Sequence, residues 1–174
     1  MELNARMEIE WAICEVEPFQ LCLAVSNNRL VFVGGDAKGE AELYQWFRQS
    51  KTKVHYCYNH SITKEYATQL EVALRGEVTR LVVEMSGTAF QQAVWSALQT
   101  IPYGETRSYS DIAALINRPT ATRAVATAIA KNPLTILIPC HRVIAKNGHL
   151  AGYRGGIAMK KQLLHIEAQN KGIM

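Results

Sequence analysis

The chain has 174 residues and a formal net charge of +4, and its composition is 48% hydrophobic and 20% charged, with eleven Gly and five Pro. These values fit one globular domain or two compact ones, and they exclude disordered, collagen-like and low-complexity chains. The four cysteines form no CxxC pair, which argues against a disulfide scaffold and favours a reducing compartment.

The N-terminal segment, MELNARMEIEW, shows no apolar core behind basic residues and so does not resemble a secretory signal. The longest apolar run, residues 134–138, is much shorter than the roughly 18 residues that a membrane span needs. We therefore expect a soluble, cytoplasmic protein that does not associate with a membrane.

The first half begins with β-rich segments. Residues 9–16, 21–25 and 30–33 are separated by turn signals at Glu17-Pro18 and Asn27-Asn28, and they predict an antiparallel meander that ends at Gly34-Gly35. Apolar residues at helical spacing predict helices over 41–49 and 66–75, the second closed by Gly76. Residues 54–62 are ambiguous, and 79–85 predict a further strand. Together these elements predict an α+β domain that ends near Ser86-Gly87.

The second half changes to helical patterns. Thr88 and Gln91 form a capping box, and apolar residues from Phe90 to Ile101 predict a helix that Pro102 ends. A second helix is predicted from Ser108, with Asp111 as its capping partner, to Ile116. After a break at 117–119, Thr120 is predicted to cap a third helix with an apolar stripe of Ala121, Ala124, Val125, Ala128 and Ile129. The last two helices predict a helix-turn-helix.

The opposite face of the third helix carries Arg123 among the small residues Ala126, Thr127 and Ala130. Residues 1–89 hold nine Lys and Arg against twelve Asp and Glu, a net −3, whereas residues 90–174 hold ten against three, a net +7. A small-residue face in a basic half favours close approach to nucleic acid. Two alternatives remain open: the face packs inside the protein with Arg123 at its rim, or the charge difference is ordinary variation.

Residues 134–138 predict a buried strand that ends at Pro139-Cys140-His141-Arg142. A thiolate is the reactive form of cysteine, and a neighbouring cation lowers the pKa of the thiol. Adjacent side chains in extended backbone point to opposite faces, so contact between imidazole and thiol requires a turn or a bridging water. A buried structural cysteine beside a surface histidine is the alternative that this dipeptide alone allows.

Several further motifs stand in register with this one: Gly87-Thr-Ala-Phe-Gln91, Trp95, Ile101-Pro102, Gly104-Glu105, Ser108-Tyr109, Arg123-Ala-Val, Asn132-Pro, Ile138-Pro-Cys-His-Arg-Val143 and Gly152-Tyr-Arg-Gly-Gly156. Together they resemble the signature of the O6-alkylguanine-DNA alkyltransferase family. The resemblance is dense over about residues 86–168, whereas residues 1–85 resemble the family only in element order. It implies a small N-terminal α/β domain (1–85), ribonuclease H-like with an antiparallel sheet. A helical, winged-helix-like DNA-binding domain (86–174) would follow.

The resemblance also implies roles for individual residues. Cys140 would take the alkyl group from guanine O6 irreversibly, with O4-alkylthymine as a further substrate, and His141 would deprotonate the thiol through a water. Glu167 would orient His141, although the helix pattern also allows a solvated charge there. Tyr109 would rotate the nucleotide and help protonate the departing guanine, or would simply pack beside Ser108. Asn132 would tie the turn before the strand.

The same resemblance implies residues for binding. Arg123 would enter the base stack in place of the flipped nucleotide, as wedges of minor-groove binders do. Ser110, Arg118 and Lys146 align with phosphate contacts. The guanine pocket would be walled by Tyr153, Arg154 and Gly155. The glycine-rich run could equally be a flexible turn, and the presence of Arg154 leaves the width of the pocket undetermined.

No cofactor is expected, and the chain is expected to act as a monomer on double-stranded DNA that contains O6-alkylguanine. We also expect no metal, because the candidate ligands do not have the CxxC or HxxxH spacing of a metal-binding motif, and Cys14 and Cys22 lie in apolar strands. The candidate ligands are Cys14, Cys22, His55, Cys57 and His60. His149 and His165 are interpreted as surface histidines. A lesion-binding module without chemistry is the competing function, and Cys140 argues against it; a transcription factor is disfavoured because no second DNA-binding domain is present.

Overall fold

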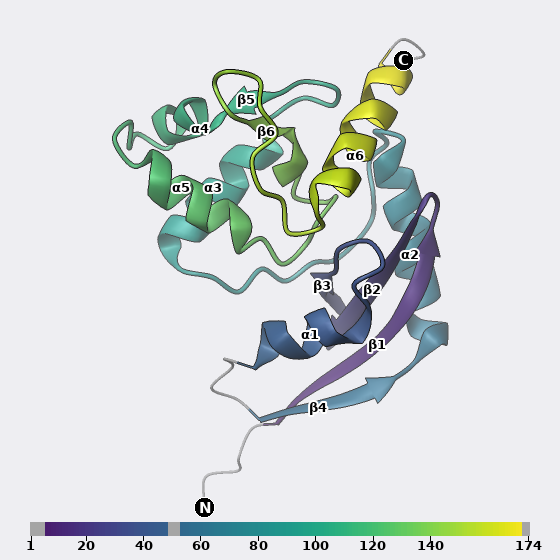
Figure 1. Ribbon diagram of the computed structural model, residues 1–174. Helices are drawn as coiled ribbons and strands as arrows, with labels where there is room; N and C mark the ends of the chain where they lie inside the picture. Colours follow the sequence, from purple (N-terminus) through teal and green to yellow (C-terminus); the bar gives the residue numbers. More distant parts are fainter. Residues whose placement is uncertain (1–5, 49–52, 172–174) are drawn as a thin grey trace, which may run out of the picture.

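The computed structural model describes residues 6–48 and 53–171. In the first half, β1 (Arg6–Val16), β2 (Phe19–Ser26), β3 (Arg29–Val33) and β4 (Lys53–Tyr58) form one sheet in the order β3-β2-β1-β4. Helix α1 (Gly39–Phe47) packs on one face of this sheet through Leu43, and α2 (His60–Leu74) packs on the other through Leu70 (Figure 1).

The second half is mainly helical. It contains α3 (Ala89–Gln99), β5 (Arg107–Ser108), α4 (Tyr109–Leu115), α5 (Thr122–Ala130), the 3-10 turn η1 (Cys140–Arg142), β6 (Val143–Ile144) and α6 (Ile157–Asn170). The two short strands β5 and β6 pair in parallel. Among the residues described, no helix is long and apolar enough to cross a membrane. The chain thus has an α+β fold, as predicted.

The predicted meander of β1, β2 and β3 is confirmed, but the expectation of an antiparallel sheet is wrong for its fourth strand. β4 pairs with β1 in parallel, with Arg6 opposite Lys53 and Trp11 opposite Tyr58. A parallel neighbour requires a crossover, and α1 provides it between β3 and β4. The ambiguous stretch 54–62 divides into β4 and the first turn of α2.

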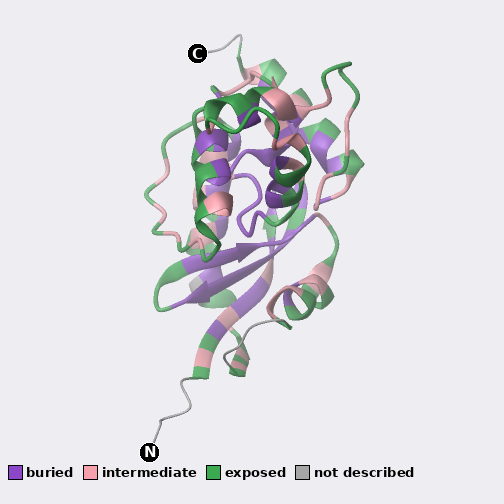
Figure 2. Cartoon of the chain, turned by 90° about the vertical axis from the view of Figure 1, so that its left-hand side faces the viewer, coloured by how far each residue is buried: buried purple, intermediate pink, exposed green. Residues whose placement is uncertain are grey.

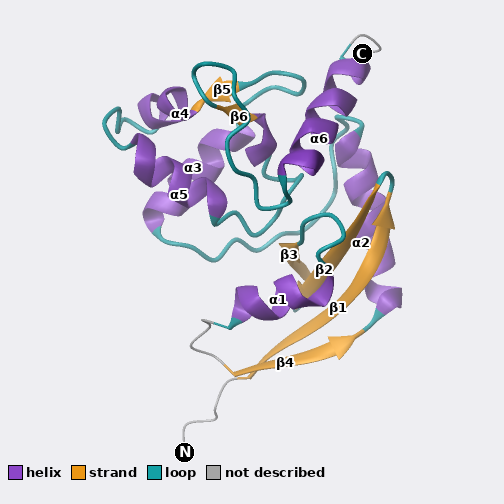
Figure 3. Cartoon of the chain, in the orientation of Figure 1, coloured by secondary structure: helices purple, strands orange, loops and turns teal. Residues whose placement is uncertain are grey.

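Two other predicted strands are wrong. Residues 79–85 form one isolated bridge, between Val83 and Leu30, in which the Leu30 N–H donates to the Val82 carbonyl and the Glu84 N–H donates to the Leu30 carbonyl. Residues 134–138 are buried except for the half-buried Leu137, yet they form a turn in which Ile136 has a positive φ of 74° and the Ile138 N–H donates to the Leu134 carbonyl. Both segments are drawn as loops in Figure 3. A buried apolar run without helical length has the same pattern as a core strand, which explains the error.

The predicted helix ends are largely confirmed. Thr88 with Gln91 and Ser108 with Asp111 form complete capping boxes at α3 and α4. Gly76 follows α2 with φ +80°, and the N–H groups of Gly76 and Glu77 donate to the carbonyls of Ala73 and Val72, as in a Schellman motif.

The cap predicted for the third helix is wrong. α5 begins at Thr122 after Ala121, without a side-chain cap, because a turn from Arg118 to Ala121 leads directly into the helix. The connection from α4 therefore spans residues 116–121 and is longer than the three residues predicted. Within the predicted stripe of α5, Val125, Ala128 and Ile129 are buried, whereas Ala124 is exposed.

The two halves share one apolar core. This core includes Leu23, Val25 and Val33 of the sheet together with Trp95, Val125 and Leu134 of the second half. Figure 2 shows the buried segments continuing from the sheet into the centre of the helical half. The Val33 N–H donates to the Pro133 carbonyl, and the Thr135 hydroxyl donates to the carbonyls of Val33 and Gly34. Residues 132–140 therefore rest directly on the end of β3.

Candidate active site

Cys140 lies at the first position of η1, immediately after the buried loop, and its relative exposure is only 3%. Asn132 holds the loop and the thiol together. Its Nδ2 donates to the Ile138 carbonyl (2.9 Å) and to Cys140 Sγ (3.0 Å), and its Oδ1 accepts from the Leu134 N–H (2.9 Å). One buried amide thus closes the turn and supplies a hydrogen-bond donor to the sulfur.

His141 follows Cys140 and is fully buried, so the alternative of a surface histidine is wrong. Its Nε2 lies 2.7 Å from Glu167 Oε1, on α6. Glu167 also accepts from Arg142 Nε (3.0 Å to each oxygen) and from the Gly104 N–H (2.9 Å). The solvated helix-end interpretation of Glu167 is therefore wrong as well. The structure brings Cys140, His141 and Glu167 to one place through a 3-10 turn rather than an extended strand.

The protonation states follow from burial and from these contacts. Burial raises the pKa of Glu167, but the hydrogen bonds and charges of His141 and Arg142 outweigh it and lower this pKa to about 2. Burial lowers the pKa of His141, although Glu167 opposes the shift. At neutral pH the pair is therefore an ionised carboxylate and a neutral imidazole.

The thiol itself does not have a lowered pKa at rest. Burial raises the pKa of Cys140, while the hydrogen bond from Asn132 and the positive charges of Arg154 and Lys160 oppose that rise. The expectation that the adjacent His141 and Arg142 lower it directly is wrong, because both side chains are directed to Glu167. A thiol with a raised pKa needs a base, and the neutral His141 beside it can act as one.

Two tyrosines lie near the sulfur. Burial raises the pKa of Tyr109, the first residue of α4, and the proximity of Cys140 adds to this rise. Burial also raises the pKa of Tyr153, again with a contribution from Cys140, and its hydroxyl is buried. Both phenols are therefore protonated at neutral pH and are available as donors.

Two charged residues have contacts at this site that the sequence reasoning missed. Arg142 holds Glu167 and donates to the Ile101 carbonyl (2.7 Å), with its guanidinium 5.4 Å from the centre of the Tyr103 ring. Lys160 is completely buried, and its Nζ donates to the carbonyls of Val143 (2.5 Å) and Ala151 (3.3 Å). The signal for Lys160 was its helical spacing with Leu163 and Glu167, because a charge on a buried face requires partners. By contrast Ile157, whose helical spacing with Leu164 would place it on the core side of the same helix, is exposed.

The predicted DNA-contacting residues lie on the surface of the second half. Arg123, Arg118 and Lys146 are exposed, and Ser110 is half-buried with its hydroxyl 2.8 Å from that of Ser108. On α5 only Ala126 of the small-residue face is partly covered, whereas Arg123, Thr127 and Ala130 are exposed. The alternative of a second buried packing face is therefore wrong. His149 and His165 are exposed, as predicted.

Arg154 does not lie with its side chain free beside the thiol. Its guanidinium contacts Glu42 and the Val33 carbonyl of the first half. Gly155, next to it, has no room for a side chain, because a Cβ there would come within 2.6 Å of the Tyr153 ring. The 153–155 segment is thus tightly packed, which argues against a merely flexible turn.

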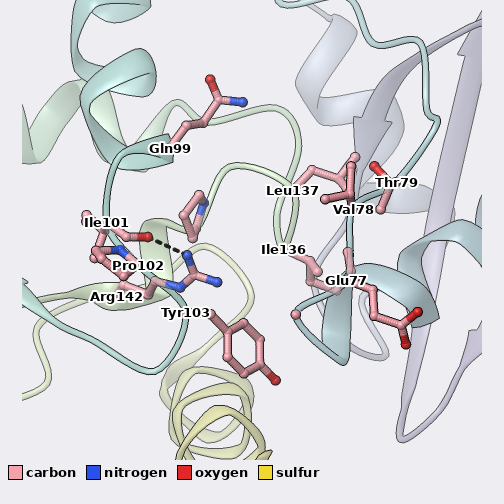
Figure 4. A pocket seen from close by; sticks show the side chains of 13 residues that line it. Glu77, Val78, Thr79, Gln99, Ile101, Pro102, Tyr103, Ile136, Leu137 and Arg142 are labelled. Carbon is pink, nitrogen blue, oxygen red and sulfur yellow. Dashed lines mark hydrogen bonds between the residues drawn. The ribbon is translucent and has the colours of Figure 1, made fainter. Parts of the chain in front are cut away.

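An open cleft of about 510 Å³ lies between the two halves, and Arg142 forms part of its wall (Figure 4). Its walls include Val78, Ile101, Tyr103, Leu137 and Arg142, and Cys140 is not among the lining residues. The cleft is therefore separate from the thiol.

Cysteine pairing and metal ligation find no support in the geometry. All four cysteines, each within the part of the chain that is described, are free. Cys14 and Cys22 are buried in different clusters on opposite faces of the sheet, and Cys57 is exposed. Within residues 6–48 and 53–171, no three His, Cys, Asp or Glu side chains are arranged to hold a metal ion.

Comparisons with known proteins match the chain to one family. Residues 89–169 match the family described as 6-O-methylguanine DNA methyltransferase, DNA binding domain. The inducible methylated-DNA--protein-cysteine methyltransferase of Bacillus subtilis is 43% identical over 96% of this chain and 94% of its own length. The bifunctional transcriptional activator/DNA repair enzyme Ada of Escherichia coli is 56% identical over 95% of this chain, which covers 47% of that protein.

Solved structures show the same fold. The crystal structure of the Mycobacterium tuberculosis OGT in complex with DNA has a TM-score of 0.74 and 34% identity, with 94% of each chain covered. An O6-methylguanine-DNA methyltransferase from Pyrococcus kodakaraensis has a TM-score of 0.73 and 26% identity, covering 91% of this chain and 98% of the other. The protein therefore belongs to the methylated-DNA--protein-cysteine methyltransferase family.

Proposed function

We propose that this protein repairs DNA by direct reversal, transferring the alkyl group of O6-alkylguanine, and of O4-alkylthymine, to its own Cys140. The observation that carries the proposal is the buried group formed by Asn132, Cys140, His141 and Glu167. A thiol that accepts a hydrogen bond, next to a histidine held by a carboxylate, is the arrangement of an activated nucleophile.

The tautomer of His141 follows from its partner. Ionised Glu167 can only accept a hydrogen bond, so Nε2 carries the proton and Nδ1 presents a lone pair. Nδ1 is buried and has no partner among the described residues. It is therefore available to take the thiol proton, through a water if the two atoms are not in direct contact.

The transfer is a displacement at the alkyl carbon. The Cys140 proton passes to His141, the thiolate forms an S–C bond, and the C–O6 bond breaks with its electron pair going to the guanine. The departing base is protonated, and the phenol of Tyr109 is the donor that we assign to this step. The product is a thioether, so each chain reacts once and no cofactor is consumed.

DNA binding is assigned to the second half, as a winged-helix-like domain spanning 86–174. The 1–85 part, ribonuclease H-like, would serve as its scaffold. A relative of the whole chain, the OGT of M. tuberculosis, was crystallised in complex with DNA. The exposed small face of α5 can approach a duplex closely, with Arg123 as the only long side chain among Arg123, Ala126, Thr127 and Ala130. We infer that Arg123 fills the stack after the damaged nucleotide is flipped, with phosphate contacts from Ser110, Arg118 and Lys146. We further propose that the protein acts as a cytoplasmic monomer.

The test is intact mass measured after incubation with one equivalent of duplex containing O6-methylguanine. The expected result is the gain of one methyl group, mapped by peptide fragmentation to Cys140 and absent from Cys140→Ala. Tight binding to the lesion without any mass gain would instead assign the chain to lesion recognition alone.

The Arg123→Ala variant is expected to slow repair of methylated duplex by about 10- to 100-fold, because unstacking a base costs a few kcal/mol that the wedge offsets. Its reaction with free O6-benzylguanine should remain within about twofold of wild type, since Arg123 is exposed and flipping is not needed there. Single-turnover rates on both substrates measure this difference. Lys131→Ala, an exposed cation just beyond α5, is the matched control. Equal slowing on both substrates would contradict the assignment to flipping.

A further inference from the structure

Arg154 connects the 153–155 segment to the first half of the chain. Its Nη1 donates to Glu42 Oε1 on α1 (2.9 Å), and its Nη2 donates to the carbonyls of Val33 and Pro133. The Arg154 and Glu42 side chains are only 11% and 12% exposed. The guanidinium also lies 4.9 Å from the ring centres of both Phe32 and Trp46.

The backbone around Arg154 is held by the same region. The Lys38 ammonium donates to the Arg154 carbonyl, and a Cβ placed on Gly35 would lie 2.6 Å from Gly155 Cα. Glu42 in turn accepts from the Gly35 N–H (2.7 Å). Residues 33–42 and 153–155 are therefore locked together by a partly buried ion pair, main-chain contacts and two aromatic rings.

Tyr153, the preceding residue, lies close both to the active-site cysteine and to the Arg154–Glu42 pair of this junction. Its hydroxyl is buried, and Cys140 is a close charge neighbour. We propose that Arg154 is a positioning residue through which the first half of the chain holds Tyr153 and the 153–155 segment beside the Cys140 thiol. The proposal rests on the proposed function, because its consequence is measured as the rate of alkyl transfer.

Arg154 can also act on the sulfur by charge alone, since its positive charge favours the Cys140 thiolate. The two roles are separable with lysine. A lysine keeps the positive charge, but it cannot contact Glu42 and two carbonyls at once while stacking on Phe32 and Trp46.

The experiment compares Arg154→Met, Arg154→Lys, Glu42→Gln and the double variant Glu42→Gln/Arg154→Met with wild type. Glu40→Gln is the matched control, because Glu40 lies exposed on the same helix. Single-turnover rates at saturating free O6-benzylguanine and on methylated duplex are measured, with affinity for undamaged duplex and thermal unfolding alongside. The pH midpoint of Cys140 alkylation by iodoacetamide reports the charge effect.

We expect Arg154→Met and Arg154→Lys to lower both rates by about 10- to 100-fold, since small misplacements of reacting groups have effects of this size. Glu42→Gln should lower them less, and the double variant should be no slower than Arg154→Met, because the two side chains form one contact. Affinity for undamaged duplex should stay within about twofold, and the iodoacetamide midpoint of Arg154→Lys should match wild type.

Wild-type rates in Arg154→Lys would overturn the proposal in favour of a charge effect, and wild-type rates in every variant would exclude any role for the contact. If Arg154→Met fails to fold, Arg154→Lys and Glu42→Gln decide between these outcomes. Failure of the proposed function would appear differently, as an absence of alkyl transfer in the wild-type chain itself.

Discussion

Glu167→Gln is expected to slow alkyl transfer to Cys140 by about a thousandfold, measured as the single-turnover rate with free O6-benzylguanine. A glutamine amide can donate to Nε2 of His141, which would move the imidazole proton to Nδ1, the atom that has to accept the thiol proton. A decrease of about a thousandfold in rate is typical of the loss of a positioned general base. Glu105→Gln is the matched control, since it makes the same change on a surface pair with Arg107. A rate within about threefold of wild type would contradict the assigned tautomer.

The same variant tests the charge of Glu167 through stability. The pKa of Glu167 falls from 4.5 to about 2 on folding, so its ionised form stabilises the folded state at neutral pH by about 3 kcal/mol. A carboxyl group whose pKa is lower in the folded state stabilises that state at pH values above its pKa in the unfolded chain. The contribution is therefore lost as pH falls from about 4.5 to about 2. The free energies of unfolding in urea of wild type and Glu167→Gln should differ at pH 7 and converge over that range. A difference that does not change with pH would show that the pKa of Glu167 is not shifted on folding.

Asn132→Ala is expected to lower the free energy of unfolding by about 3 kcal/mol and the alkylation rate by about 100-fold. The substitution leaves the buried Leu134 N–H without its acceptor, removes the donor to Cys140 Sγ and opens a small cavity. The thiol pKa should rise further, because the hydrogen bond from Asn132 lowers it in the wild type.

Urea unfolding and the iodoacetamide pH profile measure the two effects of Asn132→Ala separately. Asn147→Ala, in an exposed loop where Asn147 accepts from the His149 N–H, serves as the control and should change stability by less than about 0.5 kcal/mol. An unshifted pH profile in Asn132→Ala would show that Asn132 acts on the loop alone.

Local patterns predicted those elements whose signals are local. The capping boxes at Thr88 and Ser108 and the Gly76 helix end involve residues within five positions of one another, so they could be identified directly. The strands predicted at 79–85 and 134–138 could not be judged in this way. A strand is defined by a partner distant in sequence, and these segments have only isolated bridges.

The residues of the candidate site show the same difference between local signals and long-range contacts. Cys140, His141 and Glu167 were identified from motif and resemblance, but the orientation of Arg142 and the burial of Lys160 were not. Arg154 is the clearest example, because its position in the sequence suggested a pocket wall whereas its partners lie more than a hundred residues away, at Glu42 and Val33. Charged side chains are placed by the acceptors that can satisfy them, and those acceptors are known only once the chain has folded.

Sequence alone predicted the order of the helical elements in the second half, proposed Cys140 as the nucleophile and placed Arg123 with the small residues of α5 on one helix face. These depend on residue type and spacing. Tertiary structure alone decided that β4 runs parallel to β1, that the loop before Cys140 is a turn tied by Asn132, and that the thiol is protonated at rest. The physical reason is that burial and long-range hydrogen bonding set backbone pairing and pKa values, and neither is a property of neighbouring residues in the chain.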